Sequence, residues 1–234
     1  MTVLAIAHRG EPVGHKENTV PAFSAALALG ADMVELDLRR TRDGAIVVLH
    51  DRTLERLWGV DASVGDLDLV EVARVGDDDA RIPTLSQALA AVPCALMVDF
   101  TRREVVPGAL AAVEGAGALG RSLFVTGNVP GLRALRSLSA DARIGLTWTE
   151  STSPPLDLLD ELGAECWNPM YGLVTPEGVA EVHASGRRVS TWTVDTEDDM
   201  ARVLDAGVDA VVSNRIGALV RFLRSRSGSG VPRA

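Results

Sequence analysis

The chain has 234 residues, 47% of them hydrophobic, which suits one large globular domain. Its 32 acidic and 23 basic residues give a net charge of -9, which excludes a general attraction for nucleic acid or anionic membranes. No apolar run is long enough to span a membrane, so we expect no stable membrane insertion. The two distant cysteines, Cys94 and Cys166, match no disulfide or metal-binding pattern, and the N-terminus lacks the basic region of a signal peptide. We therefore expect a cytoplasmic protein with reduced thiols.

The first third of the chain predicts a strand, a helix and two further strands. The first strand is Val3 to Ala7, and the helix has Asn18 or Thr19 as its cap and Gly30 at its end. The next strand, Met33 to Leu38, is followed by a tight turn at Asp43-Gly44 and an apolar strand from Ala45 to Leu49. Residues 52–81 show little periodicity and are predicted to form a loop, not a second domain.

The alternation then continues to the C-terminal end. Strands are predicted at Cys94–Phe100, Leu123–Thr126, Ala142–Thr147, Ala164–Asn168, Arg188–Val194 and Val208–Val212. Helices are predicted through Leu85 and Leu89, and at Val105–Val113, Pro130–Leu138, Leu156–Leu162, Thr175–Ser185, Glu197–Ala206 and Ile216–Leu223. About eight strands that alternate with helices are typical of a closed (β/α)8 TIM barrel. The alternative, a doubly wound open sheet, usually carries a glycine-rich fingerprint after its first strand, and none occurs here. We expect one barrel domain over residues 1–224 and a flexible tail over residues 225–234.

Two acidic residues inside an apolar strand are the strongest functional signal. Glu35 and Asp37 are two positions apart, so their side chains point to the same side of the strand. Buried like charges need a cation, and a hard divalent ion prefers carboxylate oxygens. The strand after the turn then returns His50-Asp51 towards these carboxylates. The alternative is an edge strand with solvated acids and a surface hairpin.

Function in a TIM barrel gathers where the strands end, and further polar residues follow other predicted strands. Asp99 is a candidate third metal ligand, and the guanidinium of Arg9 suits a phosphate group. His8 and His50 are candidates for a general base and a general acid. Trp192 is either a wall of the substrate pocket or a core residue. His15 is predicted to be a solvated rim residue, and His183 a surface or packing residue.

These segments together resemble the glycerophosphodiester phosphodiesterase family. The resemblance rests on His8-Arg9-Gly10, Glu17-Asn18-Thr19, Glu35-Leu36-Asp37, Thr41-Arg42-Asp43-Gly44, Val48-Leu49-His50-Asp51, Ile82-Pro83-Thr84-Leu85 and Trp192-Thr193-Val194-Asp195, and it covers nearly the whole chain. It implies a TIM-barrel hydrolase of lipid and glycerol metabolism that converts a small-molecule glycerophosphodiester to sn-glycerol 3-phosphate and an alcohol. It also implies one divalent metal ion, Ca²⁺ or Mg²⁺.

The predicted strand Cys94–Phe100 departs from the family pattern where it ends. The family usually has Glu-x-Lys where this chain has Asp99-Phe100-Thr101, so the carboxylate reaches one methylene less and Thr101 brings no positive charge. Two alternatives therefore stay open. One is a lysophospholipase D-like or lyase activity on lysophospholipids, and the other is a non-catalytic barrel that binds a phosphoester.

Overall fold

The computed structural model describes residues 3–77, 80–151 and 156–228, in which strands and helices alternate. The strands are β1 (Leu4–Ala7), β2 (Met33–Arg40), β3 (Ile46–Val48), β4 (Ala95–Phe100), β5 (Ser122–Thr126), β6 (Arg143–Trp148), β7 (Cys166–Pro169), β8 (Arg188–Thr191) and β9 (Ala210–Ser213). The main helices are α1 (Val20–Ala28), α4 (Leu85–Ala91), α5 (Val106–Gly115), α6 (Val129–Leu138), α7 (Leu156–Leu162), α8 (Pro176–Ala184), α9 (Glu197–Asp205) and α10 (Ile216–Gly228).

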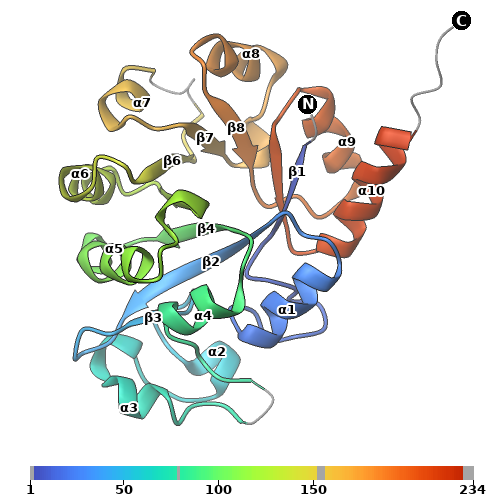
Figure 1. The fold of residues 1–234 in the computed structure, drawn as a ribbon. Coiled ribbons are helices and arrows are strands. Elements are labelled where there is room, and N and C mark those ends of the chain that lie inside the picture. The colour runs from blue at the N-terminus through green and yellow to red at the C-terminus, as the bar shows by residue number, and fades with distance from the viewer. Residues whose placement is uncertain (1–2, 78–79, 152–155, 229–234) are drawn as a thin grey trace, which may run out of the picture.

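The strands form a closed barrel. Within the described residues one sheet holds nine strands, and all except β3 pair in parallel with their neighbours. Pairing of β1 with both β2 and β9 closes the parallel strands into a ring. Figure 1 shows the helices around the outside of this ring, with α5 to α8 on one side and α9 and α10 on the other. The predicted (β/α)8 TIM barrel is confirmed.

The core has two parts, as expected for strands that are buried on both faces. The larger part lies between the strands and the outer helices and includes Phe23, Phe100 and Phe124. A smaller apolar cluster fills the interior of the barrel and includes Ile6 and Met97. The interior is packed, so a substrate can bind only at an end of the barrel.

Local sequence signals fix the beginnings and ends of several helices. The hydroxyl of Thr19 accepts a hydrogen bond from the backbone of Ala22 at the start of α1, and Gly30 follows the end of this helix with a positive φ of 92°. Thr84 and Gln87 form a reciprocal capping box at the start of α4. These boundaries agree with the prediction. No helix in the described part of the chain is both long and apolar enough to cross a membrane.

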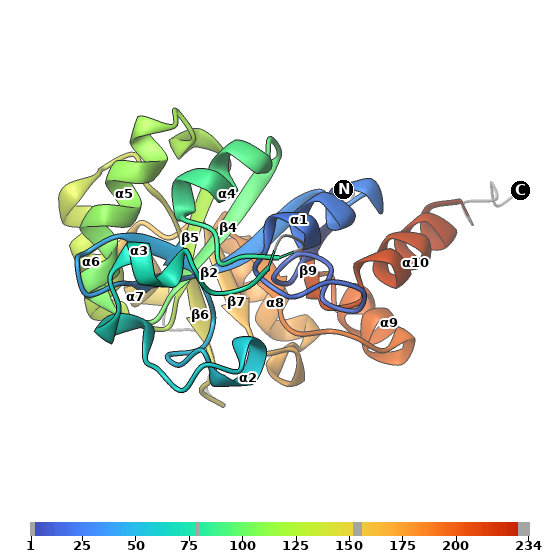
Figure 2. The same cartoon turned by 90° about the horizontal axis from the view of Figure 1, so that it is seen from below.

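The segment 52–81 is more ordered than the prediction of a loop. It contains two short helices, α2 (Glu55–Trp58) and α3 (Leu69–Val72). Figure 1 places both next to β3, and Figure 2 shows both helices on the side of the molecule that is seen from below. Apolar residues of this segment, among them Leu54 and Val64, pack against Val47 and Leu49 in a separate small cluster. Each helix is only about one turn long, which is too short for a periodic pattern to be visible in the sequence.

The C-terminal helix also differs from its prediction, because α10 runs to Gly228 and not to Leu223. The division into a barrel over residues 1–224 and a tail over residues 225–234 stays a proposal. Residues 229–234 lie outside the described residues.

Candidate active site

Three carboxylates meet where β2 and β4 approach the end of the barrel. Glu35 and Asp37 occupy the same face of β2, and Asp37 is the direct neighbour of Asp99 across the β2–β4 pair. One oxygen of each carboxylate lies within 4.8 Å of the others. Glu35 and Asp37 are only 4% and 8% exposed. The structure therefore brings together the three residues that the sequence offered as metal ligands.

Three buried acids at this separation carry a large electrostatic cost. Burial, followed by the charges of Asp37 and Asp99, raises the pKa of Glu35 well above its usual range. Burial and the charge of Asp37 raise the pKa of Asp99 to about 7. A divalent cation among these oxygens would offset the repulsion, and all-oxygen donors suit Ca²⁺ or Mg²⁺. The residues present therefore fit a metal of this kind.

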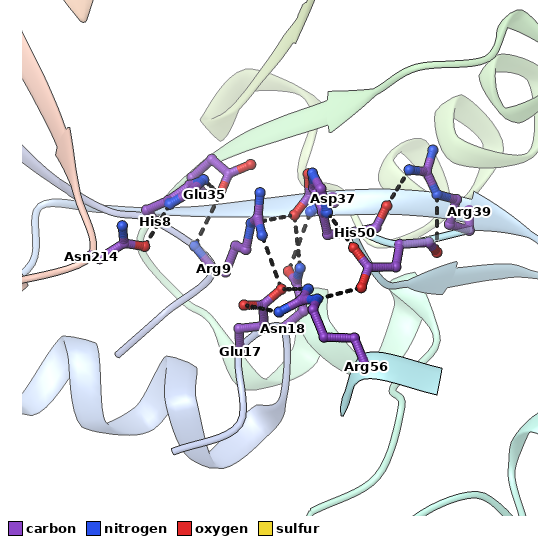
Figure 3. Close-up of polar contacts among 11 residues, drawn as sticks. His8, Arg9, Glu17, Asn18, Glu35, Asp37, Arg39, His50, Arg56 and Asn214 are labelled. Atoms are coloured by element: carbon purple, nitrogen blue, oxygen red, sulfur yellow. Dashed lines mark hydrogen bonds and ion pairs between the residues drawn. The ribbon is translucent and has the colours of Figure 1, made fainter. Parts of the chain in front are cut away.

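His8 follows β1 and is oriented by the opposite end of the chain (Figure 3). Its Nδ1 lies 2.7 Å from Oδ1 of Asn214, and the amide nitrogen of Asn214 donates to Asp195 at 2.8 Å. Because that oxygen of Asn214 is an acceptor, the proton of the neutral imidazole is on Nδ1. Nε2 is then free to accept a proton, and it lies 3.9 Å from Oε2 of Glu35. Burial and the charge of Arg9 lower the pKa of His8, so the ring is neutral at physiological pH.

Arg9 occupies a left-handed backbone position that aims both its amide and its side chain at the acids. Its φ is 57°, and its backbone N–H donates to Glu35 at 2.9 Å. Its Nη1 donates to Glu17 at 2.9 Å, while its buried Nε lies 3.1 Å from Asp37 in a geometry that makes no hydrogen bond. A phosphate oxygen could satisfy this donor.

Gly10 explains why the backbone can turn directly after Arg9. It has a φ of 86°, and a Cβ at this position would lie 2.7 Å from the backbone carbon of Ala22. No other residue fits there without moving α1, so Gly10 helps to hold Arg9 in place.

His50 lies near the other end of the carboxylate cluster and is also held through Nδ1 (Figure 3). Nδ1 is 2.7 Å from Oδ1 of Asp51, and Oδ2 of Asp51 accepts a hydrogen bond from Nε of Arg56. Arg56 also donates to Glu17, which links this group to Arg9. The hydrogen bond from Arg56, followed by that from His50, lowers the pKa of Asp51 to about 2. A charged Asp51 keeps a proton on Nδ1 of His50 and leaves Nε2 for proton transfer.

Trp192 is half-buried and contacts the apolar cluster inside the barrel. Its indole N–H donates to the backbone oxygen of Asn168 at 3.0 Å, which fixes the orientation of the ring. Both alternatives for this residue, a core tryptophan and a wall of the pocket, agree with this position.

His15 and His183 lie apart from this group of residues. His15 is exposed on the loop before α1 and pairs with Glu11. His183 pairs with Asp209, which precedes β9 and is therefore near the opposite end of the barrel from His8.

Several contributors to the site were not assigned a function from the sequence. The sequence predicts Asn18 as a possible helix cap, but its amide donates to Asp37 at 2.8 Å and its oxygen accepts from the backbone of Asp37. Asn214 and Asp195 each follow a strand, and the sequence alone relates neither residue to His8. Their position at strand ends was the available signal, but which strand ends lie beside His8 depends on barrel closure.

Arg39 is a further residue near the site that the sequence did not indicate. It is two positions beyond Asp37 on the same face of β2, and its guanidinium donates to the hydroxyl of Thr101. Thr101 itself brings no charge, as predicted, but a cation from the neighbouring strand is in contact with it. The end of β4 therefore has a positive charge beside it, although its own sequence provides none there.

Comparisons with known proteins relate the whole chain to one enzyme family. The model of the glycerophosphoryl diester phosphodiesterase family matches residues 8–218. The chain is 30% identical to the glycerophosphodiester phosphodiesterase of Caldanaerobacter subterraneus subsp. tengcongensis, over 96% of this chain and 99% of that protein.

Solved structures share the fold. An Oleispira antarctica phosphodiesterase in complex with the product sn-glycerol-3-phosphate aligns with a TM-score of 0.87 and 21% identity, over 94% of this chain and 96% of the other. The glycerophosphodiester phosphodiesterase of Thermotoga maritima aligns with a TM-score of 0.82 and 22% identity, over 94% and 98%. With the family model spanning nearly the whole barrel, the chain belongs to the glycerophosphoryl diester phosphodiesterase family and is an enzyme of that class.

Proposed function

We propose that this chain hydrolyses glycerophosphodiesters to sn-glycerol 3-phosphate and an alcohol, with one Ca²⁺ or Mg²⁺ ion held by Glu35, Asp37 and Asp99. The observation that carries the proposal is a cluster of three carboxylates with a histidine near each end. His8 and His50 are both held through Nδ1, so both present Nε2 for proton transfer.

The two histidines have opposite tasks in this proposal. Nε2 of neutral His8 accepts the proton of the attacking oxygen, which belongs either to water or to the 2-hydroxyl of the glycerol. As the new P–O bond forms, the bond to the alcohol breaks. Attack by the 2-hydroxyl gives a cyclic phosphate, and water must then break its P–O bond to the 2-oxygen to leave sn-glycerol 3-phosphate. Nε2 of His50 donates a proton to the departing alcohol oxygen. The lowered pKa of His8 favours its use as the base.

The charge of the phosphate is met by Arg9 and by the metal site. Arg9 offers its Nε and one further N–H to the phosphate oxygens once substrate replaces part of its contact with Asp37. A bound divalent ion offsets the carboxylate charges and stabilises negative charge on the phosphoryl oxygens. Trp192 provides an apolar wall for the glycerol carbons.

The direct test is release of sn-glycerol 3-phosphate from glycerophosphocholine and glycerophosphoglycerol by purified protein with Ca²⁺ or Mg²⁺. Release from both supports the proposal. Release of choline from lysophosphatidylcholine without turnover of either diester would instead assign the lysophospholipase D-like activity. Transient accumulation of a cyclic phosphate in a single turnover would assign attack by the 2-hydroxyl. Direct formation of sn-glycerol 3-phosphate without that species would assign attack by water.

We predict that metal affinity rises with pH. Because Asp99 has a pKa of about 7 and the pKa of Glu35 is also raised, metal binding must displace protons from the site. The apparent association constant should increase by up to about tenfold per pH unit for each proton released, between pH 5.5 and 8. Calorimetric titration with Ca²⁺ in buffers of different ionisation enthalpy measures both the affinity and the protons released. The Asp99→Asn variant should release fewer protons, and an affinity independent of pH would contradict the assignment.

A further inference from the structure

A basic pocket lies beside the active site. A hollow of about 520 Å³ is formed by β2, the segment after His50, and the loop after β4. Its charged lining consists of five arginines and one acid, namely Arg39, Arg40, Arg42, Arg52, Arg102 and Glu104. This concentration of positive charge is unexpected in a chain whose net charge is -9.

Most of this charge has no acidic partner. Arg42 forms ion pairs with Asp68 and Glu71. By contrast, Arg40, Arg52 and Arg102 form no ion pair with any acid in the described parts of the chain. Several unpaired guanidinium groups around one hollow repel each other and favour an anion among them.

Arg39 connects this pocket to the catalytic residues. It is half-buried, and its guanidinium donates to the backbone oxygens of His50 and Asp51 and to the hydroxyl of Thr101. All three acceptors are neutral, so its charge is not cancelled by a direct ion pair. Figure 3 shows Arg39 on the far side of His50 from His8. His50 is the proposed donor to the departing alcohol, so the pocket is on the side of the substrate where that alcohol lies.

We propose that this pocket binds a second phosphate group, carried by the alcohol part of the substrate. The preferred substrates are then glycerophosphodiesters whose alcohol is itself phosphorylated. The inference rests on the proposed function and names its substrate class. Arginine suits this task because its planar fork matches the geometry of phosphate oxygens.

A matched pair of substrates tests the inference. Glycerophosphoinositol 4-phosphate and glycerophosphoinositol differ by one phosphate on the alcohol. We expect kcat/KM for the phosphorylated substrate to be at least about tenfold higher, mainly through a lower KM. The double variant Arg52→Gln with Arg102→Gln should lose this preference and keep the wild-type rate on glycerophosphoinositol. Arg103→Gln is the control, because Arg103 adjoins Arg102 but does not line the pocket. Equal kcat/KM for the two substrates in the wild-type enzyme would overturn the inference.

A binding measurement separates this inference from the proposed hydrolysis. Inositol 4-phosphate represents the departing alcohol, and calorimetry should show that the double variant binds it at least about tenfold more weakly than wild type. That result supports binding of a phosphorylated alcohol in the pocket, whether or not the diesters are hydrolysed. Failure to hydrolyse either diester would refute only the proposed function. If inorganic phosphate binds as tightly as inositol 4-phosphate and does not compete with glycerophosphoinositol, the pocket is a separate anion site. The assignment to the substrate would then be wrong.

Discussion

Replacement of His8 or His50 by alanine is expected to lower kcat by about 10²–10⁴-fold, the usual scale for loss of a general base or acid. The two variants should differ in their dependence on the alcohol. Without His50, a substrate with an acidic leaving group such as p-nitrophenol needs no protonation and should recover much of its rate. Without His8, the loss should persist for every leaving group. The measurement is the steady-state rate of each variant with glycerophosphocholine and with the p-nitrophenyl ester of glycerol 3-phosphate.

The other two histidines provide matched controls for these variants. His15→Ala and His183→Ala should stay near wild-type activity, because each imidazole is exposed and pairs with a carboxylate outside the three clustered acids. Metal affinity measured in the His8 and His50 variants should stay close to that of wild type. If His183→Ala is as damaging as His8→Ala, the assignment of the active site to this end of the barrel is wrong.

Removal of the divalent ion should abolish activity and change the pH dependence of stability. The pKa values of Glu35 and Asp99 are raised in the folded protein, so without metal the folded state holds protons that the unfolded chain has already lost. The free energy of unfolding of the metal-free protein should therefore decrease as pH rises from about 5 to 8. The pKa of His8 is lowered by burial and by the charge of Arg9, so this group has the opposite effect and its contribution to stability increases as pH rises. The two carboxyls should outweigh this single group.

Chelation followed by thermal unfolding at pH 5.5 and pH 8 measures this effect. We expect the rise in Tm on adding Ca²⁺ or Mg²⁺ to be larger at pH 8 than at pH 5.5. The variant Glu35→Gln should show less activity and a weaker pH dependence, because the amide keeps the shape of the side chain without its charge. Full activity in protein freed of divalent ions, or equal stabilisation by metal at both pH values, would contradict shared coordination by these acids.

The sequence predicts the barrel well because its signals are local. Alternating apolar runs, the cap at Thr84 and the glycine at the end of α1 each depend on neighbours only a few residues away. Glu35 and Asp37 are predictable for the same reason, since strand geometry alone places them on one face. The return of His50 through β3 is also local, because it follows a short turn after β2.

Contacts between distant segments are the part that could not be predicted. The hydrogen bond from Asn18 to Asp37 needs the loop before α1 to fold across β2. The contact of Arg39 with Thr101 depends on the length and path of a flexible side chain across two strands. The small helices α2 and α3 are stabilised by packing on β3, and neither is long enough to show its pattern alone.

The orientation of His8 has a consequence for when the enzyme becomes active during synthesis. The three clustered acids, Arg9 and His50 all lie within the first 99 residues, so they emerge early from the ribosome. Asn214, which holds the His8 ring, follows the last strand, and that strand is also the one that closes the barrel against β1. In a nascent chain, the three clustered acids could therefore come together while the His8 ring is still free to rotate. With His8 as the proposed base, turnover is expected to begin only after β9 has paired with β1, which would keep an incomplete chain inactive.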